Sequence, residues 1–153
     1  MLCEYLRAHE DTVYMYAGGV IDEEYSRSIS AFAEEHSISE QVMYVGELAP
    51  GKELNAYYNA ADCSVFTSNL ESFGLVIIEA ISSGTPVIVG SNLMFELDGG
   101  YSIYRTEEEF VALVDTALRE NSSRTDTSCR ASAERYSWDN ATKMHLQILQ
   151  ELN

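Results

Sequence analysis

Apolar residues along this chain occur in two alternating patterns, short continuous runs and longer stretches with helical spacing. Short apolar runs bounded by glycine, proline or polar clusters are typical of buried strands, whereas apolar residues three and four positions apart indicate amphipathic helices. The first pattern predicts strands at residues 12–17, 41–45, 63–66, 87–89 and 101–104.

Helices are predicted between these strands. Asp22 is a suitable N-cap for a helix over residues 23–36. The apolar positions of that helix recur at helical spacing, at Tyr25, Ile29, Phe32 and Ala33. Further helices are predicted at residues 1–10, 53–61, 74–83, 106–118, 129–136 and 138–152.

Strands and helices alternate along the whole chain, which is the pattern of a parallel sheet with helices on both faces. The sequence therefore predicts an α/β, doubly wound fold that forms a single domain over residues 1–153. In such sheets, ligands bind beyond the carboxyl ends of the strands. Residues 18–19, 46–47 and 68–73 follow strands, so we expect them to converge on one rim.

Residues 69–92 form the stretch with the most distinctive chemistry. The strand at 63–66 is followed by a loop that carries Glu71, and then by a helix that should begin at Gly74 and end near Gly84. A helix N-terminus offers unpaired backbone N–H groups and the positive end of the helix dipole, which together favour phosphate. Gly74 would let such a ligand approach the backbone closely.

Two carboxylates flank this predicted phosphate seat. Glu71 lies in the loop, and Glu79 lies on the helix about 7 Å beyond Gly74, at a rise of about 1.5 Å per residue. Carboxylates repel phosphate, but they accept hydrogen bonds from hydroxyls. The two glutamates could therefore hold two hydroxyl-bearing parts of one ligand with a phosphate between them, as in a nucleotide-sugar. Alternatively, each glutamate could be a solvated surface charge.

The same stretch resembles the donor-site signature of retaining glycosyltransferases with the GT-B fold, specifically glycosyltransferase family 4 (glycosyl transferases group 1). The resemblance rests on Glu-Ser-Phe-Gly-Leu-Val-Ile-Ile-Glu-Ala at 71–80 and Gly-Thr-Pro-Val-Ile-Val at 84–89. The flanks agree, with Tyr-Tyr-Asn-Ala-Ala-Asp-Cys-Ser-Val-Phe at 57–66 and Tyr-Ser-Trp at 136–138. The resemblance implies a Rossmann-like domain, the C-terminal half of a GT-B fold, lacking its first strand.

The resemblance also implies an activity, the transfer of a sugar from a UDP- or GDP-sugar to an acceptor hydroxyl with retention of anomeric configuration. On this basis Glu71 is the catalytic residue, in contact with the donor sugar, and Glu79 binds the ribose hydroxyls. The segment near the sugar and phosphates comprises Ser72, Phe73, Gly74 and Leu75. The base is expected near Gly46, Glu47 and Leu48. We expect no metal ion or other cofactor, because backbone N–H groups supply part of the stabilisation of the departing diphosphate.

The chain departs from the family pattern at its start. The family's domain opens with a strand followed by an arginine and a lysine that neutralise the diphosphate, and nothing in this sequence matches them. The missing strand belongs in the middle of the sheet, so its absence predicts a gap, a rearranged pairing, or an oligomer formed through the exposed sheet edge. A GT-B enzyme also needs an N-terminal acceptor-binding domain. We therefore expect this chain to be a fragment that is inactive alone.

The composition and net charge of the chain limit its possible partners and its cellular location. Of 153 residues, 46% are hydrophobic and 22% charged, which suits a globular domain with a core. The formal net charge of −16 argues against nucleic acid as a partner and also opposes a phosphate ligand. The three cysteines form no metal or redox pattern, and no apolar run is long enough for a transmembrane segment. We expect a cytoplasmic protein, or one held at the inner face of a membrane by the rest of the enzyme.

Two other functions compete with donor binding in an active transferase for surface polysaccharide or glycolipid synthesis. A non-catalytic nucleotide-sugar-binding or interaction module is favoured by the absent cationic pair. A sugar-nucleotide epimerase or a phosphorylase of the GT-B type is the other alternative. The spacing of Glu71 and Glu79 argues against a phosphorylase.

Overall fold

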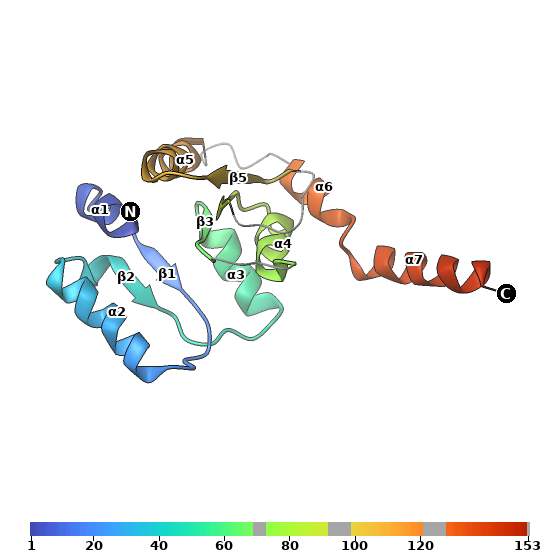
Figure 1. Ribbon diagram of the computed structural model, residues 1–153, viewed down its shortest axis with the longest axis horizontal. Helices are drawn as coiled ribbons and strands as arrows, with labels where there is room; N and C mark the ends of the chain where they lie inside the picture. The colour runs from blue at the N-terminus through green and yellow to red at the C-terminus, as the bar shows by residue number, and fades with distance from the viewer. Residues whose placement is uncertain (69–72, 92–98, 121–127, 153) are drawn as a thin grey trace. The chain divides into compact units, whose positions relative to one another are not determined.

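The computed structural model describes residues 1–68, 73–91, 99–120 and 128–152 (Figure 1). Its helices and strands follow the predicted alternating order. Contacts divide the chain into two compact units, Met1–Leu54 and Asn55–Asn153, which we call the first and the second unit.

The first unit is a pair of parallel strands packed against helices. Its core is small and takes one or two side chains from each element, with Leu6, Ala33 and Ile38 buried against Tyr14 and Val42. The strands pair in register, with Tyr14 opposite Val42. The elements are α1 (Leu2–Ala8), β1 (Tyr14–Tyr16), α2 (Glu23–Glu35), the 3₁₀ turn η1 (Ser39–Gln41) and β2 (Val42–Tyr44).

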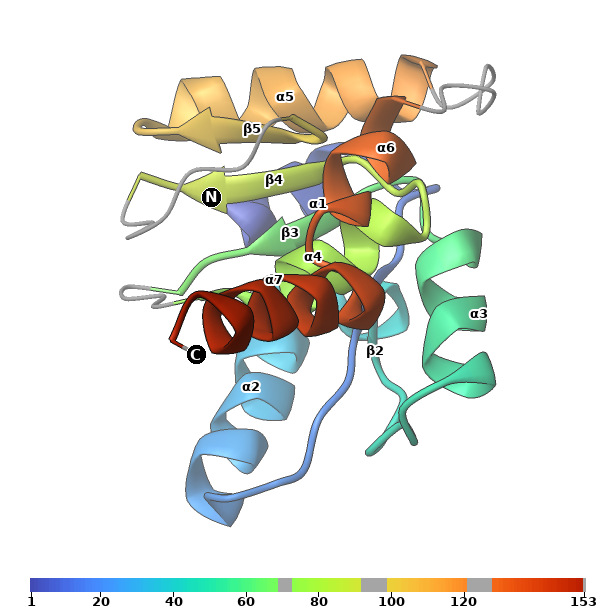
Figure 2. The ribbon, with the colours of Figure 1, turned by 90° about the vertical axis from the view of Figure 1, so that its right-hand side faces the viewer.

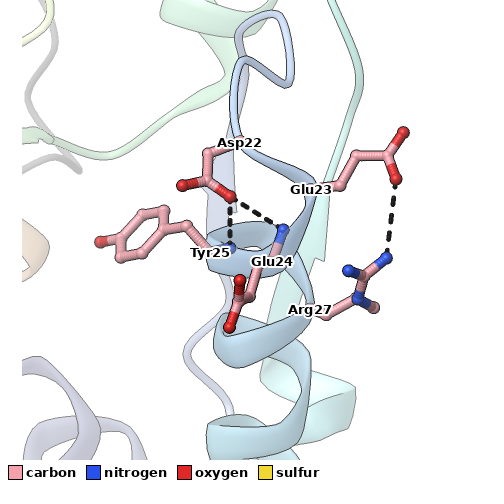
Figure 3. A network of polar contacts seen from close by, with 5 residues as sticks. All are labelled: Asp22, Glu23, Glu24, Tyr25 and Arg27. Carbon is pink, nitrogen blue, oxygen red and sulfur yellow. Dashed lines mark hydrogen bonds and ion pairs between the residues drawn. The ribbon is translucent and has the colours of Figure 1, made fainter.

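Helix α2 begins where the sequence predicts. The Asp22 carboxylate accepts hydrogen bonds from the backbone N–H groups of Glu24 (2.9 Å) and Tyr25 (3.0 Å), as Figure 3 shows. The apolar face of α2 is less buried than its helical spacing predicts. Ala33 is buried, but the side chains of Tyr25 and Phe32 are 67% and 47% exposed. A two-stranded sheet offers too little area to cover the whole face of a helix of this length.

The second unit contains a three-stranded parallel sheet in the order β3-β4-β5. Strand β4 lies in the middle, and its residues Val87, Ile88 and Val89 are all buried, as expected for a central parallel strand. Figure 2 shows the three strands side by side, with α5 along β5. The elements are α3 (Lys52–Ala60), β3 (Ser64–Phe66), α4 (Leu75–Ser82), β4 (Val87–Gly90), β5 (Tyr101–Tyr104), α5 (Glu107–Glu120), α6 (Ser128–Glu134) and α7 (Trp138–Glu151).

Helices cover this sheet on the apolar faces that the sequence predicts. Helix α4 contributes the largest part of the core, which also includes Val87, Val89 and Ala133. Helix α5 buries Phe110, whose ring meets Tyr104 edge-on at 5.2 Å between centroids. Helix α7 is different, because it extends beyond α6 away from the sheet (Figure 1), and Trp138 at its start is 89% exposed.

The sheet topology confirms parallel pairing and shows a break. In the described residues, β1 pairs with β2 and β3-β4-β5 form a second sheet, and no ladder joins the two sheets. The single domain expected over residues 1–153 remains a prediction. No helix in the described ranges is both long and apolar enough to span a bilayer.

Candidate functional site

The N-terminus of α4 is set by Gly74. This residue has φ 65° and ψ 49°, the left-handed conformation that glycine adopts without steric cost. Its carbonyl accepts hydrogen bonds from the N–H groups of Ile77 (2.9 Å) and Ile78 (3.1 Å), so the helix begins directly after it. The N–H groups at the start of a helix have no acceptor within the helix. The flanking side chains of Phe73 and Leu75 are 49% and 63% exposed, while Gly74 itself is buried.

Helix α4 has one buried face and one exposed face, which we call the open face. Ile77, Ile78, Ala80 and Ile81 point into the core of the second unit. Glu79 lies on the open face, four residues after exposed Leu75. Residues four apart are neighbours on one side of a helix. The Glu79 side chain therefore lies on the same side of α4 as the Leu75 side chain, about one turn beyond the N-terminal N–H groups.

The C-terminus of α4 is fixed by contacts from α3 and α6. Arg130 on α6 donates to the carbonyl oxygen of Ser83 at 2.9 Å, where a cation also stabilises the negative end of the helix dipole. Thr85, which is fully buried, donates its hydroxyl proton to the Tyr58 carbonyl oxygen at 2.5 Å. The predicted end of the helix near Gly84 is confirmed, and Gly84 has a φ of 80°. These contacts hold the C-terminal end of α4 in place.

Tyr58 contacts the open face of α4. Its hydroxyl donates toward Glu79 Oε2 at 3.4 Å and lies 3.3 Å from the carbonyl oxygen of Val76. Burial raises the pKa of Tyr58 to about 12, and the negative charge of Glu79 and the hydrogen bond to it add to the shift. The hydroxyl therefore stays protonated near neutral pH and acts as a donor to Glu79.

The structure also joins two segments that are far apart in the sequence. The ring of Phe73, next to Gly74, meets the ring of Tyr136 edge-on at 6.2 Å between centroids. Tyr136 in turn carries the Arg135 guanidinium over its ring at 4.8 Å. Tyr136, the first residue of the Tyr-Ser-Trp stretch, therefore lies against the segment that opens α4.

In the first unit, two loops meet at the carboxyl ends of β1 and β2, as predicted. Gly18 donates its N–H to the Gly46 carbonyl oxygen at 3.0 Å, and the Tyr44 hydroxyl donates to the Gly18 carbonyl oxygen at 2.7 Å. Gly46 has a φ of 83°. Glu47 is exposed and Leu48 is half-buried. Convergence of these loops with residues 68–73 remains a prediction.

Two of the predicted site residues, Glu71 and Ser72, lie outside the described residues. Among the residues that the structure describes, no three His, Cys, Asp or Glu side chains gather closely enough to hold a metal ion. Neither Tyr58 nor Arg130 is among the site residues predicted from the sequence. Helical spacing shows which residues share a face, but it does not show which other helix that face meets.

Parallel strands covered by helices define an α/β fold, which matches the C-terminal domains of GT-B glycosyltransferases. Sucrose-phosphate synthase from Thermosynechococcus elongatus matches 99% of this chain with 41% of its own, at a TM-score of 0.80 and 24% identity. Anabaena HepE matches 99% of this chain with 43% of its own, at a TM-score of 0.74 and 20% identity.

The chain belongs to the family Glycosyl transferases group 1, which matches residues 2–133. A D-inositol 3-phosphate glycosyltransferase from Saccharomonospora viridis is 33% identical over 149 residues, which cover 91% of this chain and 34% of that protein. The alpha-monoglucosyldiacylglycerol synthase of Streptococcus pneumoniae is 36% identical over 83 residues, covering 54% of this chain and 18% of that protein. The chain thus spans about a third or less of the length of these relatives.

Proposed function

We propose that this chain is the donor-binding domain of a retaining glycosyltransferase that transfers a sugar from a nucleotide-diphospho-sugar to an acceptor hydroxyl. The family membership supports sugar transfer. The acceptor is held by a further domain, in keeping with relatives about three times as long as this chain. Relatives named for glucosyldiacylglycerol and inositol phosphate favour a pathway of glycolipid or surface polysaccharide synthesis.

The observation that carries the proposal is the shared open face of α4. The diphosphate lies at the N-terminus, where Gly74 allows close approach and the N–H groups of Leu75 and its neighbours donate. Glu79, one turn further along the same face, accepts hydrogen bonds from the ribose hydroxyls. By the family resemblance, Glu71 and Ser72 lie at the donor sugar, and Gly46, Glu47 and Leu48 lie at the base.

This arrangement acts mainly on the leaving group. Negative charge grows on the diphosphate as the bond to the sugar breaks, and fixed N–H dipoles that point at this charge stabilise it without reorganisation. The Glu79 carboxylate, one turn from the N-terminus, binds the ribose and so fixes the diphosphate relative to those dipoles.

The test is a calorimetric titration of this chain with UDP, GDP and their sugar conjugates. HepE was crystallised with UDP and with UDP-glucose, which makes uridine nucleotides the first choice of probe. We expect one nucleotide to bind with a dissociation constant between about 1 μM and a few millimolar, and Glu79→Ala to weaken it about 10-fold or more. Glu151→Ala is the matched control, because it removes an exposed carboxylate from α7.

Two results would overturn the proposal. One is that the chain binds none of these nucleotides at millimolar concentration. The other is that Glu79→Ala and Glu151→Ala change the affinity equally, since binding would then not depend on the open face of α4.

A non-catalytic nucleotide-sugar-binding module is the second candidate, favoured because nothing in this sequence matches the arginine and lysine that neutralise the diphosphate in the family pattern. This candidate predicts the same titration result. An assay of the full-length protein for sugar transfer from the nucleotide-sugar that binds distinguishes the two candidates. Only a transferase consumes that donor in the presence of acceptor.

A further inference from the structure

Tyr58 lies at the junction between α3 and the open face of α4. Its hydroxyl is 3.4 Å from Glu79 Oε2 and 3.3 Å from the carbonyl oxygen of Val76. A tyrosine hydroxyl has one proton to donate, so the two acceptors compete for it. The outcome of that competition decides whether Tyr58 acts on the helix backbone or on the glutamate side chain.

The carboxylate is the stronger acceptor of the two. The Val76 carbonyl lies inside α4, where the helix pattern already gives it the N–H of Ala80 four residues on. Glu79 carries a full negative charge and accepts only. Hydrogen bonds to an ionised acceptor are about twice as strong as neutral ones. The proton of Tyr58 therefore favours Glu79.

The backbone of Tyr58 is held firmly, which gives this contact a fixed direction. The buried Thr85 hydroxyl donates to the Tyr58 carbonyl oxygen at 2.5 Å. Asn55, one turn earlier on α3, accepts a hydrogen bond from the Ser83 hydroxyl at 2.9 Å. Asn59 accepts from Arg130 at 3.4 Å. Asn55 and Tyr58 thus tie one side of α3 to the C-terminal end of α4, and Asn59 ties it to α6.

The side chain of Tyr58 is held as well. It packs against the core cluster that includes Ile77, Ile78 and Ile81. A ring placed by packing has few rotamers to lose when its hydroxyl forms a hydrogen bond. Without this contact, the exposed Glu79 side chain would have to be ordered by any ligand that binds it.

We propose that Tyr58 is a positioning residue that holds one carboxylate oxygen of Glu79 and so presents the other oxygen to the ribose hydroxyls of the bound nucleotide. The inference rests on the function proposed above. It adds that the carboxylate is ordered before the nucleotide arrives, so that binding does not have to immobilise it.

The test compares ribonucleotides with nucleotides that lack the hydroxyls. UDP and GDP, and the 2′,3′-dideoxy forms of each, are titrated into the chain and into Tyr58→Phe, which removes the hydroxyl and keeps the ring. Tyr57→Phe is the matched control, because Tyr57 is the half-buried neighbour on the same helix. We expect Tyr58→Phe to weaken binding of the ribonucleotide about 3- to 10-fold and to leave the dideoxy form unchanged.

A double-mutant cycle gives the second readout. If Tyr58 acts through Glu79, Tyr58→Phe has no further effect on nucleotide affinity once Glu79→Ala is present. A general structural role would weaken the ribo and dideoxy forms alike and would persist in the Glu79→Ala background. Either of those results, or an unchanged affinity of Tyr58→Phe for the ribonucleotide, would overturn the inference.

The two proposals fail differently. If the unaltered chain binds no nucleotide, or if Glu79→Ala leaves the affinity unchanged, the donor-site assignment itself is wrong and this inference falls with it. If Glu79→Ala weakens binding while Tyr58→Phe does not, the donor site stands and Tyr58 has no positioning role.

Discussion

Cys63 illustrates how burial sets the chemistry of a single residue. It precedes β3 directly and is partly covered. Burial raises the pKa of the Cys63 thiol to about 11, and the neighbouring charge of Asp62 adds to the shift. The thiolate is the reactive form of cysteine, so a raised pKa makes the thiol inert.

We therefore expect Cys63 to react slowly with iodoacetamide. Its thiolate fraction at pH 8 should be about 100-fold below that of a thiol with a pKa near 9, and alkylation should slow in proportion. Peptide mass spectrometry over time, in buffer and in denaturant, measures this. Equal rates for Cys63 in the folded and the unfolded chain would contradict the expectation.

At the scale of one element, α2 depends on its cap. Asp22 satisfies two N–H groups at the start of the helix, and the only other polar contact drawn in Figure 3 is the Glu23–Arg27 ion pair at 3.6 Å. The side chains of that pair are 84% and 72% exposed, so water screens their attraction. Because few apolar residues of α2 are buried, the cap should carry a large share of the stability of the helix.

Asp22→Ala should lower the free energy of unfolding by about 1 kcal/mol, because it leaves two N–H groups at the helix start without their side-chain acceptor. Glu23→Ala is the control, and it should cost no more than about 0.5 kcal/mol. Urea unfolding followed by circular dichroism measures both. If the two substitutions had equal effects, the cap would not be the main local determinant of α2.

Helix α5 is also capped by a side chain at its start, but its glutamate meets a different backbone donor from the one that the capping-box motif specifies. The Thr106 hydroxyl accepts a hydrogen bond from the Glu109 N–H at 3.2 Å, which is one half of the capping-box motif that a Thr followed three residues later by Glu can form. The Glu109 carboxylate, however, accepts from the N–H of Arg105 at 2.6 Å, one residue earlier than the cap itself. The motif therefore identified the start of the helix, and the local backbone path decided which donor the carboxylate meets.

At the scale of the whole molecule, stability is concentrated where α4 meets the sheet. Ile77 is 1% exposed and packs among the core residues of the second unit. Ile148 on α7 is 55% exposed. The two isoleucines lie in helices of the same unit. Substituting each of them therefore compares the loss of the same side chain at a buried and at an exposed position.

We expect Ile77→Ala to lower the free energy of unfolding by about 2–5 kcal/mol, because it removes buried methylene groups and leaves a cavity. Ile148→Ala should change it by no more than about 0.5 kcal/mol. Thermal unfolding of the two variants and the parent chain measures this difference. A large loss on substitution of Ile148 would mean that α7 is covered in solution.

The sequence by itself determined the order of helices and strands, the cap of α2, the start of α4 at Gly74 and the parallel pairing. These features depend on local rules, namely apolar spacing, capping side chains and the backbone freedom of glycine, which operate within a few residues.

The tertiary structure alone decided how distant residues meet. It placed the Tyr58 hydroxyl near Glu79, Arg130 at the end of α4, and Phe73 against Tyr136. It also left two separate sheets in the described residues and exposed much of α2 and α7. An apolar stripe in the sequence shows that a face can be buried, but whether it is buried depends on the area that other elements offer to cover it.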